Sequence, residues 1–354
     1  MKLLEGKKIL ITGGTGSLGK VLLRRLLSGT EGNPAKIIVF SRDEAKQHAL
    51  RVEYQHRKSA TDEIIYKNFS ERLEFFIGDV RDSRSIASAL RDVDVVFNAA
   101  ALKQVPTCEY FPYEAVLTNV MGAENIVRAI RELRLNVETV VGISTDKAVK
   151  PVNVMGMTKS IQERVFACGN INGSGTRFVL VRYGNVLASR GSVIPLFHEQ
   201  IRNGGPVTIT SPDMTRFLLS LDEAVDLILT AVHEAKPGET YIPRVPAARV
   251  LDVAHALIGK RAIDTTITGI RPGEKLHEIL VSEEEAHRTI LRGDNYVIAP
   301  ILPEMQDSSL NGPFIEKEYS SADSVMTPND VREMLVRRNL MVDHEIELEG
   351  EILR

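Results

Sequence analysis

The sequence is poor in the residues that build covalent crosslinks and metal centres. It has two cysteines, Cys108 and Cys168, which belong to no CxxC or Cys/His cluster. We therefore expect neither a disulfide framework nor a zinc site, and we expect both thiols to be buried. The eight histidines show no metal-ligand spacing, so the prediction is that the protein binds no metal.

Long apolar runs and an excess of positive charge are missing as well. No stretch of about 18 uninterrupted apolar residues occurs, and residues 1–6 lack the basic start and apolar core of a signal peptide. The prediction is a cytoplasmic protein with no membrane span. The formal net charge of -3 gives no general attraction to a phosphate backbone, so no nucleic-acid partner is expected.

The composition that remains is that of an ordinary globular protein, and its length of 354 residues fits one large α/β unit or a domain with a smaller lobe. Short β-branched runs alternate with helical stretches through the first half, which is typical of strands buried on both faces of a parallel sheet. The predicted strands cover Lys8–Thr12, Lys36–Phe40, Leu73–Ile77, Val93–Asn98, Thr139–Ile143 and Phe178–Arg182. The predicted helices between them include Leu18–Leu27, Ser83–Leu90 and Tyr113–Leu133. We therefore predict an α/β fold with a Rossmann-like doubly wound parallel sheet and a smaller C-terminal lobe.

A glycine-rich loop connects the first predicted strand to the first predicted helix. Lys8–Thr12 leads into the sequence Gly-Gly-Thr-Gly-Ser-Leu-Gly, and an apolar helical pattern follows. In this context the glycines allow a tight turn and let backbone N–H groups at a helix N-terminus approach a pyrophosphate. The predicted cofactor contacts in this loop are Gly13, Thr15, Gly16, Ser17, Leu18 and Gly19.

The end of the second predicted strand favours NADP over NAD. An acidic side chain at this place would bind the ribose hydroxyls of NAD, whereas this chain has Ser41 and Arg42. The Arg42 guanidinium offers a planar fork of donors for a 2′-phosphate, and Ser41 offers a hydroxyl. Asp43 and Lys46 flank the same position, and for these two the alternative is a solvated helix start.

Three further positions offer either cofactor contacts or plain packing. Asp79 and Val80 follow the third predicted strand, where a carboxylate can meet the adenine amine. Ala99 follows the fourth strand, where a small residue lets the backbone pass close to the cofactor. With these positions we expect residues 1–187 to form the NADP-binding Rossmann domain.

The rest of the chain has a weaker alternation of elements and more Gly and Pro. We expect residues 188–301 to form mainly the substrate-binding lobe, with some segments returning to the sheet. Residues 302–354 are predicted to be a C-terminal extension, with a possible oligomer contact. In this extension Thr327 and Pro328 resemble an N-cap and a first helical position, which predicts a helix through Leu335.

Met155 and Lys159 lie four residues apart on the helix expected after the strand Thr139–Ile143. The pattern resembles the short-chain dehydrogenases, in which a Tyr precedes a Lys by four residues and takes a hydroxyl proton from the substrate. Lys159 fits this pattern, but Met155 occupies the Tyr position, and a thioether neither takes nor gives a proton at neutral pH. We predict that Lys159 contacts the cofactor and takes the proton, directly or through a water, and that Met155 shapes an apolar wall.

Four segments together resemble one family closely. They are Ala99–Pro106, Ser144–Ala148, Arg182–Val186 and Arg271–Lys275. The chain is similar in them to the soluble inverting UDP-N-acetylglucosamine 4,6-dehydratases of the extended short-chain dehydrogenase superfamily. It most resembles the capsular-polysaccharide branch, in which Met replaces the catalytic Tyr. The resemblance also implies a homo-oligomer, a hexamer or a dimer.

The resemblance implies a reaction and the residues that carry it. NADP oxidises carbon 4 of the sugar, water leaves across carbons 5 and 6, and the hydride returns to carbon 6. Asp146 then protonates the departing 6-hydroxyl, and Lys147 removes the proton on carbon 5. The alternative for this pair is an exposed ion pair on a surface turn. The residues implied to bind the UDP-sugar are Lys103, Thr145, Asn185, Arg190, Arg216, Arg271 and Glu274.

Two other functions stay open at this point. A UDP-sugar 4-epimerase uses the same fold and the same oxidation at carbon 4, but it needs no acid for a 6-hydroxyl. The presence of Asp146 and Lys147 therefore favours dehydration. A non-catalytic NADP-binding protein is suggested only by the missing tyrosine, and Lys159 together with the Asp146–Lys147 pair argues against it.

Overall fold

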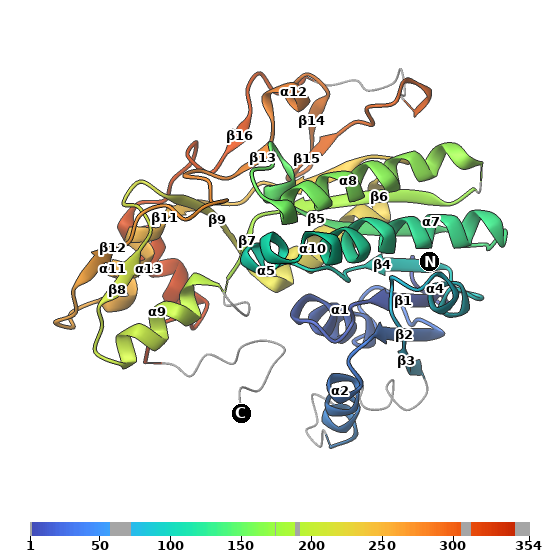
Figure 1. The fold of residues 1–354 in the computed structure, drawn as a ribbon, viewed down its shortest axis with the longest axis horizontal. Coiled ribbons are helices and arrows are strands. Elements are labelled where there is room, and N and C mark those ends of the chain that lie inside the picture. Colours follow the sequence, from blue (N-terminus) through green and yellow to red (C-terminus); the bar gives the residue numbers. More distant parts are fainter. Residues whose placement is uncertain (1, 57–71, 174, 188–191, 306–312, 344–354) are drawn as a thin grey trace.

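The computed structural model describes residues 2–56, 72–173, 175–187, 192–305 and 313–343. Its centre is a nine-stranded sheet of order β14-β15-β10-β6-β5-β4-β1-β2-β3 (Figure 1). The pairs from β3 through β10 are parallel, and β15 pairs antiparallel with both β10 and β14. The strands are β1 Lys8–Thr12, β2 Lys36–Ser41, β3 Leu73–Ile77, β4 Val95–Asn98, β5 Thr139–Thr145, β6 Arg177–Tyr183, β10 Thr240–Pro243, β14 Thr289–Arg292 and β15 Asn295–Ile298.

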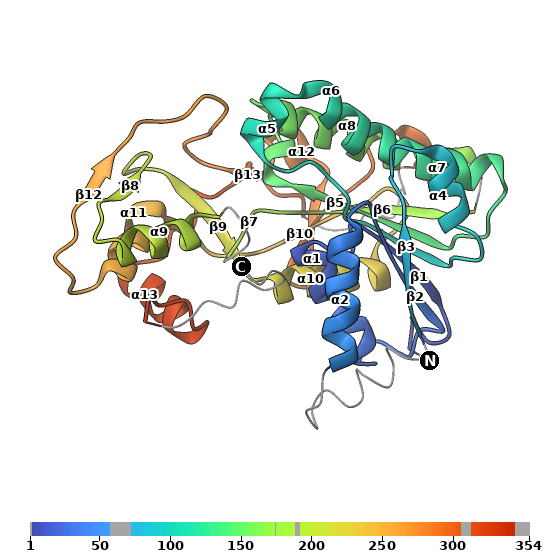
Figure 2. The same ribbon diagram turned by 60° about the horizontal axis from the view of Figure 1, so that its bottom comes forward.

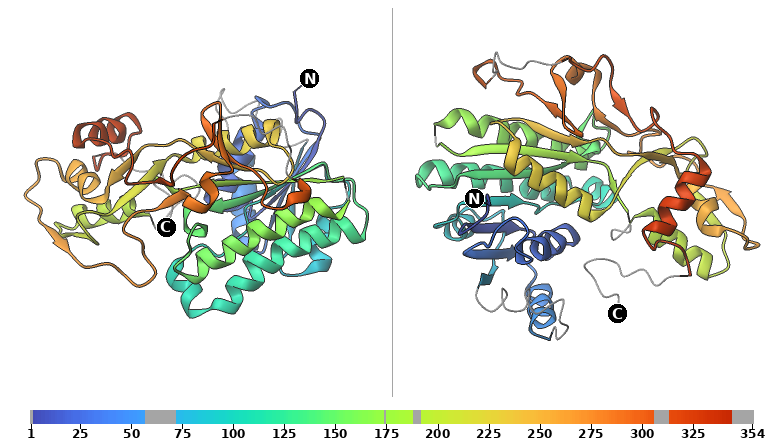
Figure 3. Two further views of the ribbon diagram at one scale, coloured as in Figure 1. Left: turned by 90° about the horizontal axis from the view of Figure 1, so that it is seen from above. Right: turned by 180° about the vertical axis from the view of Figure 1, so that it is seen from behind.

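Helices cover both faces of this sheet, because its strands carry apolar side chains on both sides. Ile9 and Ile11 of β1 face one core cluster, while Leu10 faces the other. The first cluster is closed by α1 Ser17–Leu27, α2 Glu44–His56 and α10 Leu221–Glu234. The second is closed by α4 Ser83–Ala89, α7 Gly122–Glu132 and α8 Val154–Gly169. Figure 2 and the left view of Figure 3 show the two helical layers on either side of the sheet. The predicted doubly wound fold is thus confirmed.

The predicted elements match the observed ones closely, with one informative difference. The single helix predicted over Tyr113–Leu133 is divided into α6 Pro112–Ala115, a π-helical segment Val116–Met121 and α7. A π-helical segment widens the helix by a residue and is common at functional sites. Before it, α5 Val105–Tyr110 follows the loop after β4.

The lobe packs around a third apolar cluster, away from the sheet at the left of Figure 1. Thr327 caps helix α13, Pro328–Arg337, through a reciprocal hydrogen-bond pair with Asp330, so the predicted N-cap is observed. Strands β10, β14 and β15 return to the central sheet, and the division into domains at residues 187 and 301 stays a prediction.

The remaining helices are α9 Val193–Arg202, α11 Val250–Ile258, α12 Glu283–Ala286 and α13 Pro328–Arg337. The remaining strands are β7 Asn185–Val186, β8 Val207–Ile209, β9 Thr215–Leu219, β11 Ala247–Arg249, β12 Thr265–Ile267, β13 Ile279–Val281 and β16 Tyr319–Ser320.

The two cysteines differ in their environment. Cys108 is buried, as predicted, but Cys168 is exposed, so the prediction for the second thiol is wrong. Cys168 lies in the last turn of α8, where its neighbours Ala167 and Gly169 are buried and it points to the solvent face. Within the described ranges, no helix is both long and apolar enough to cross a bilayer.

Candidate functional site

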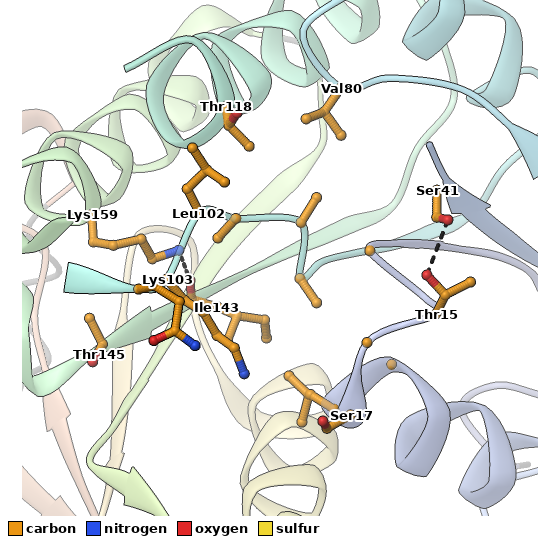
Figure 4. Close-up of a pocket in the computed structure, with 18 of the residues that line it drawn as sticks. Thr15, Ser17, Ser41, Val80, Leu102, Lys103, Thr118, Ile143, Thr145 and Lys159 are labelled. Atoms are coloured by element: carbon orange, nitrogen blue, oxygen red, sulfur yellow. Dashed lines mark hydrogen bonds between the residues drawn. The ribbon is translucent and has the colours of Figure 1, made fainter. Parts of the chain in front are cut away.

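A cavity of about 710 Å³ runs along the carboxyl ends of the parallel strands. Ligands of open α/β sheets bind at this edge, where the loops after the strands converge. Figure 4 shows Thr15 and Ser41 at one end of the pocket and Lys159 and Thr145 at the other. Most of the predicted cofactor and catalytic residues line it: Gly13, Thr15, Gly16, Ser17, Leu18, Gly19, Ser41, Arg42, Asp43, Lys46, Val80, Ala99, Lys103, Thr145, Lys147, Met155 and Lys159.

The glycine-rich turn lies at the start of α1, and two of its glycines have no room for a side chain. Gly13 has φ of +67°, and a Cβ there would lie 2.8 Å from the Cα of Ala100. A Cβ on Gly19 would lie 2.6 Å from the Cα of Gly14. The turn therefore requires glycine at both positions, and it leaves backbone N–H groups at the start of α1 available to a ligand phosphate.

Arg42 marks the far end of the cavity with a side chain that is half exposed. Its Nη1 lies 3.7 Å from Asp79, and Arg81 donates from Nε to the same carboxylate at 2.8 Å. Burial alone raises the pKa of Asp79, but the hydrogen bonds from Arg81 outweigh it and hold the pKa below its usual value. Asp79 does not line the cavity, so its predicted contact with adenine stays a prediction.

Lys159 lies on α8 and reaches the sheet with its amine. The Nζ atom donates to the carbonyl oxygen of Ile143 and, at 2.6 Å, to Oε1 of Gln162. Burial lowers the pKa of Lys159 to about 8, although the charge of Glu163 opposes this shift. About a tenth of this amine is therefore neutral at pH 7.

Met155 is buried one turn before Lys159 and lines the same cavity. It packs with Cys108 and Ala115 in a small apolar cluster that Leu102 and Val105 complete. The side chain thus forms part of an apolar wall, and it places no proton acceptor where the short-chain dehydrogenases carry a tyrosine hydroxyl.

Asp146 and Lys147 follow β5 directly and form a largely buried ion pair. The Asp146 side chain is fully buried, and its Oδ1 accepts from Nζ of Lys147 at 3.0 Å and from Thr145 Oγ1 at 2.8 Å. Its Oδ2 is buried without a hydrogen-bond partner. Burial lowers the pKa of Lys147, but the charges of Asp146 and Glu278 outweigh this effect and raise it above its usual value. The alternative of an exposed surface pair is excluded.

The predicted substrate residues separate into those at the cavity and those away from it. Lys103 and Thr145 line the cavity, whereas Asn185, Arg216, Arg271 and Glu274 do not. The Arg216 guanidinium donates to the carbonyl oxygens of Thr215, Lys275 and Leu276 at 2.7–3.2 Å, which ties β9 to the segment before β13. Arg190 lies outside the described residues. Diphosphate binding by these residues stays a prediction.

One family model matches residues 9–300, and its description is "polysaccharide biosynthesis protein". The chain belongs to this family. The match spans both the sheet and most of the lobe, and it includes every residue that lines the cavity.

Curated relatives of this chain carry two kinds of enzyme name. The inverting UDP-N-acetylglucosamine 4,6-dehydratase of Campylobacter jejuni is 41% identical over 87% of this chain and 88% of that protein. The UDP-glucose 4-epimerase of Rickettsia typhi is 45% identical over 82% of each chain. The family is thus one of nucleotide-sugar dehydratases and epimerases of the extended short-chain dehydrogenase type.

Solved structures share the fold of this chain. The X-ray structure of Pen from Bacillus thuringiensis has a TM-score of 0.84 and 32% identity, and it covers 96% of this chain and 100% of its own. A dTDP-glucose 4,6-dehydratase from Streptomyces venezuelae has a TM-score of 0.64 at 21% identity, covering 76% of this chain and 86% of its own, which shows the shared fold.

A Methanocaldococcus jannaschii relative, 45% identical over 84% of this chain and 86% of its own, is named as a membrane protein.

The residues at the site that were not predicted there include Thr118, Tyr183 and Glu278. Thr118, on the π-helical segment, lines the cavity with a buried Oγ1 that has no hydrogen-bond partner. Tyr183 lines the cavity from the end of β6, opposite Thr145 in the register. Glu278 lies 3.4 Å from Nζ of Lys147. The π-helical widening and the approach of residue 278 leave no local pattern in the sequence, whereas Tyr183 follows a predicted strand directly.

Proposed function

We propose that this protein is an NADP-dependent 4,6-dehydratase of a UDP-sugar. The observation that carries the proposal is the buried Asp146–Lys147 pair, with Lys147 lining the same cavity as Lys159. Elimination of water from a sugar needs an acid for the departing hydroxyl and a base for the carbon proton. The name of the Campylobacter jejuni relative supports UDP-N-acetylglucosamine as the substrate, with inversion at carbon 5.

The dinucleotide has a fitting place at the glycine-rich end of the cavity. Gly13 and Gly19 leave backbone N–H groups for the pyrophosphate, and Ser41 and Arg42 offer donors for a 2′-phosphate. When bound, NADP supplies a hydride acceptor for carbon 4 and later a hydride donor for carbon 6. The absence of an acidic side chain at positions 41 and 42 supports NADP over NAD.

Lys159 supplies the base for oxidation at carbon 4 in this proposal. Its amine is buried, lines the cavity and has a pKa of about 8, so its neutral form takes the 4-hydroxyl proton directly or through a water. The Met155 side chain contributes an apolar surface beside it. No phenol is required at position 155 for this step.

The Asp146–Lys147 pair performs the elimination by redistributing one proton. The pair holds a single shared proton, on the amine in the resting enzyme because the pKa of Lys147 is raised. Transfer of this proton to Asp146 across the 3.0 Å contact produces a carboxylic acid and a neutral amine. Lys147 then takes the proton from carbon 5, and Asp146 gives its proton to the 6-hydroxyl, which leaves as water.

The test is a product assay with UDP-N-acetylglucosamine and NADP in deuterated water. The expected product has lost one water in mass and carries solvent deuterium on carbon 5. A product of unchanged mass with the 4-hydroxyl inverted would instead identify an epimerase, the function that the name of the 45% identical Rickettsia typhi relative supports. An absence of both products over a range of UDP-sugars would contradict enzymatic function at this site.

A further inference from the structure

Glu278 is a buried carboxylate that the proposed mechanism does not use. It lies directly before β13, and its side chain is only 3% exposed. Its Oε1 lies 3.4 Å from Nζ of Lys147 and 3.8 Å from Nε of Arg216. Its Oε2 is buried without a hydrogen-bond partner. Burying a carboxylate oxygen without a hydrogen-bond partner costs free energy, so packing alone does not account for the position of Glu278.

Hydrogen bonds hold the backbone around Glu278 against the loop that follows β5. The Nδ2 of Asn153 donates to the carbonyl oxygen of Gly273 at 2.8 Å, and the Lys275 amine donates to the carbonyl oxygen of Val149. Glu278 itself donates from its backbone N–H to Ser321 Oγ at 2.9 Å and accepts from the Ser321 N–H at 2.8 Å. These bonds fix the carboxylate beside the lysine.

Four charged groups face the Lys147 amine. Asp146 comes from the same turn, Arg216 comes from β9, and Lys275 and Glu278 come from the segment before β13. The two carboxylates are nearly inaccessible, so water screens their attraction for the ammonium only weakly. The second carboxylate stabilises the protonated lysine beyond what Asp146 does alone.

We propose that Glu278 is a positioning residue for Lys147, which holds the amine beside Asp146 and sets the pH at which it accepts a proton. The inference rests on the proposed function, since it concerns the base of the elimination. The charge of Glu278 beside the amine favours retention of the carbon 5 proton on the lysine and disfavours its return to the sugar.

The experiment compares Glu278→Gln with a matched control, Glu318→Gln. The glutamine side chain keeps the size of the glutamate and a hydrogen-bond acceptor but removes the charge. Glu318 lies 3.0 Å from Nζ of Lys150, in an exposed ion pair outside the cavity. The Lys147 amine is titrated by NMR in protein with isotope-labelled lysine side chains, and its signal is assigned by its loss in Lys147→Met. The pH dependence of deuterium incorporation at carbon 5 is measured in parallel.

We expect the titration of Lys147 to move to lower pH by about one unit or more in Glu278→Gln, the size typical of a close opposite charge, and not to move in Glu318→Gln. The ascending limb of the exchange rate should move with it. An unchanged titration of Lys147 would overturn the inference, even if the variant were less stable. If Glu278→Gln does not fold, Glu278→Asp should give a smaller shift in the same direction, and no shift would be equally decisive.

The two proposals fail in different ways. A wild-type protein that yields no dehydrated product contradicts the proposed function, while the NMR titration still decides whether Glu278 controls the charge of Lys147. A dehydrating wild type with an unchanged Glu278→Gln titration contradicts only the role of Glu278.

Discussion

The two ends of the cavity are built in different ways. The dinucleotide end is lined mainly by two short segments of the chain, within Gly13–Gly19 and Ser41–Lys46, and its cationic side chains are about half exposed. The catalytic end holds buried charges whose partners come from distant parts of the chain, as Glu278 does for Lys147. A short motif therefore suffices to recognise the first end, whereas the protonation states at the second end depend on packing.

Lys147 and Lys159 show how strongly packing determines the pKa of a lysine. Both amines are at the catalytic end, but Lys147 faces two carboxylates, and its pKa is raised. Lys159 donates to neutral oxygens of Ile143 and Gln162, and burial lowers its pKa to about 8. In the resting protein the same side chain is thus held as a cation in one place and is more easily deprotonated in the other.

The largest effect is expected from Lys159→Met, which removes the proposed base for oxidation at carbon 4. Reduction of the cofactor on mixing with substrate should slow by about a thousandfold or more, as losses of general bases typically do. The reduced nicotinamide is followed by its near-ultraviolet absorbance in a single turnover. The control Met155→Ala should keep appreciable activity with a weaker substrate fit, and a Lys159→Met enzyme that reduces its cofactor at the wild-type rate would rule out this lysine.

Lys147→Met should separate the two chemical steps. Dehydration and deuterium incorporation at carbon 5 should fall by about a hundredfold or more, while the fold and the reduction of the cofactor are retained, because this lysine acts only after carbon 4 is oxidised. Mass spectrometry of the sugar product gives both readouts. Incorporation of deuterium at the wild-type rate would mean that another residue is the base.

The two lysines should also contribute differently to the pH dependence of the protein's stability. Because the folded-state pKa of Lys159 lies at about 8, below its ordinary value, the unfolded chain binds more protons between about pH 8 and 10. The free energy of unfolding of the wild type relative to Lys159→Met should therefore rise over this window, by on the order of 3 kcal/mol in total.

The Lys147→Met variant is the control for this measurement. Because the folded-state pKa of Lys147 is raised, the contribution of this lysine to the free energy of unfolding is fully present below its unfolded pKa. The difference in the free energy of unfolding between the wild type and Lys147→Met should therefore stay constant up to about pH 10. Denaturant unfolding at a series of pH values gives both curves. A flat curve for Lys159→Met as well would show that burial does not shift its pKa.

The smallest effect is expected at the half-exposed dinucleotide end. Arg42→Asp removes donors for a 2′-phosphate and adds an acceptor for ribose hydroxyls, so the preference should move from NADP toward NAD. Loss of charge-assisted hydrogen bonds predicts a roughly ten- to hundredfold weaker affinity for NADP. Both affinities are measured by titration in wild type and variant, and unchanged binding of NADP would remove Arg42 from the site.

The sequence alone determined the alternating strands and helices, the glycine-rich turn and the spacing of Met155 and Lys159, because these features depend on neighbours along the chain. It also pointed to the right family, through motifs that extend over most of the chain. It was wrong about Cys168, whose exposure depends on which face of the last turn of α8 meets solvent. Three features are seen only in the tertiary structure. Glu278 lies beside Lys147, and the Arg216 guanidinium donates to backbone carbonyl oxygens. Thr118 lies on a segment with π-helical hydrogen bonding. These outcomes depend on contacts between segments far apart in sequence, and the resulting burial and charge, rather than residue type, decide what each side chain does.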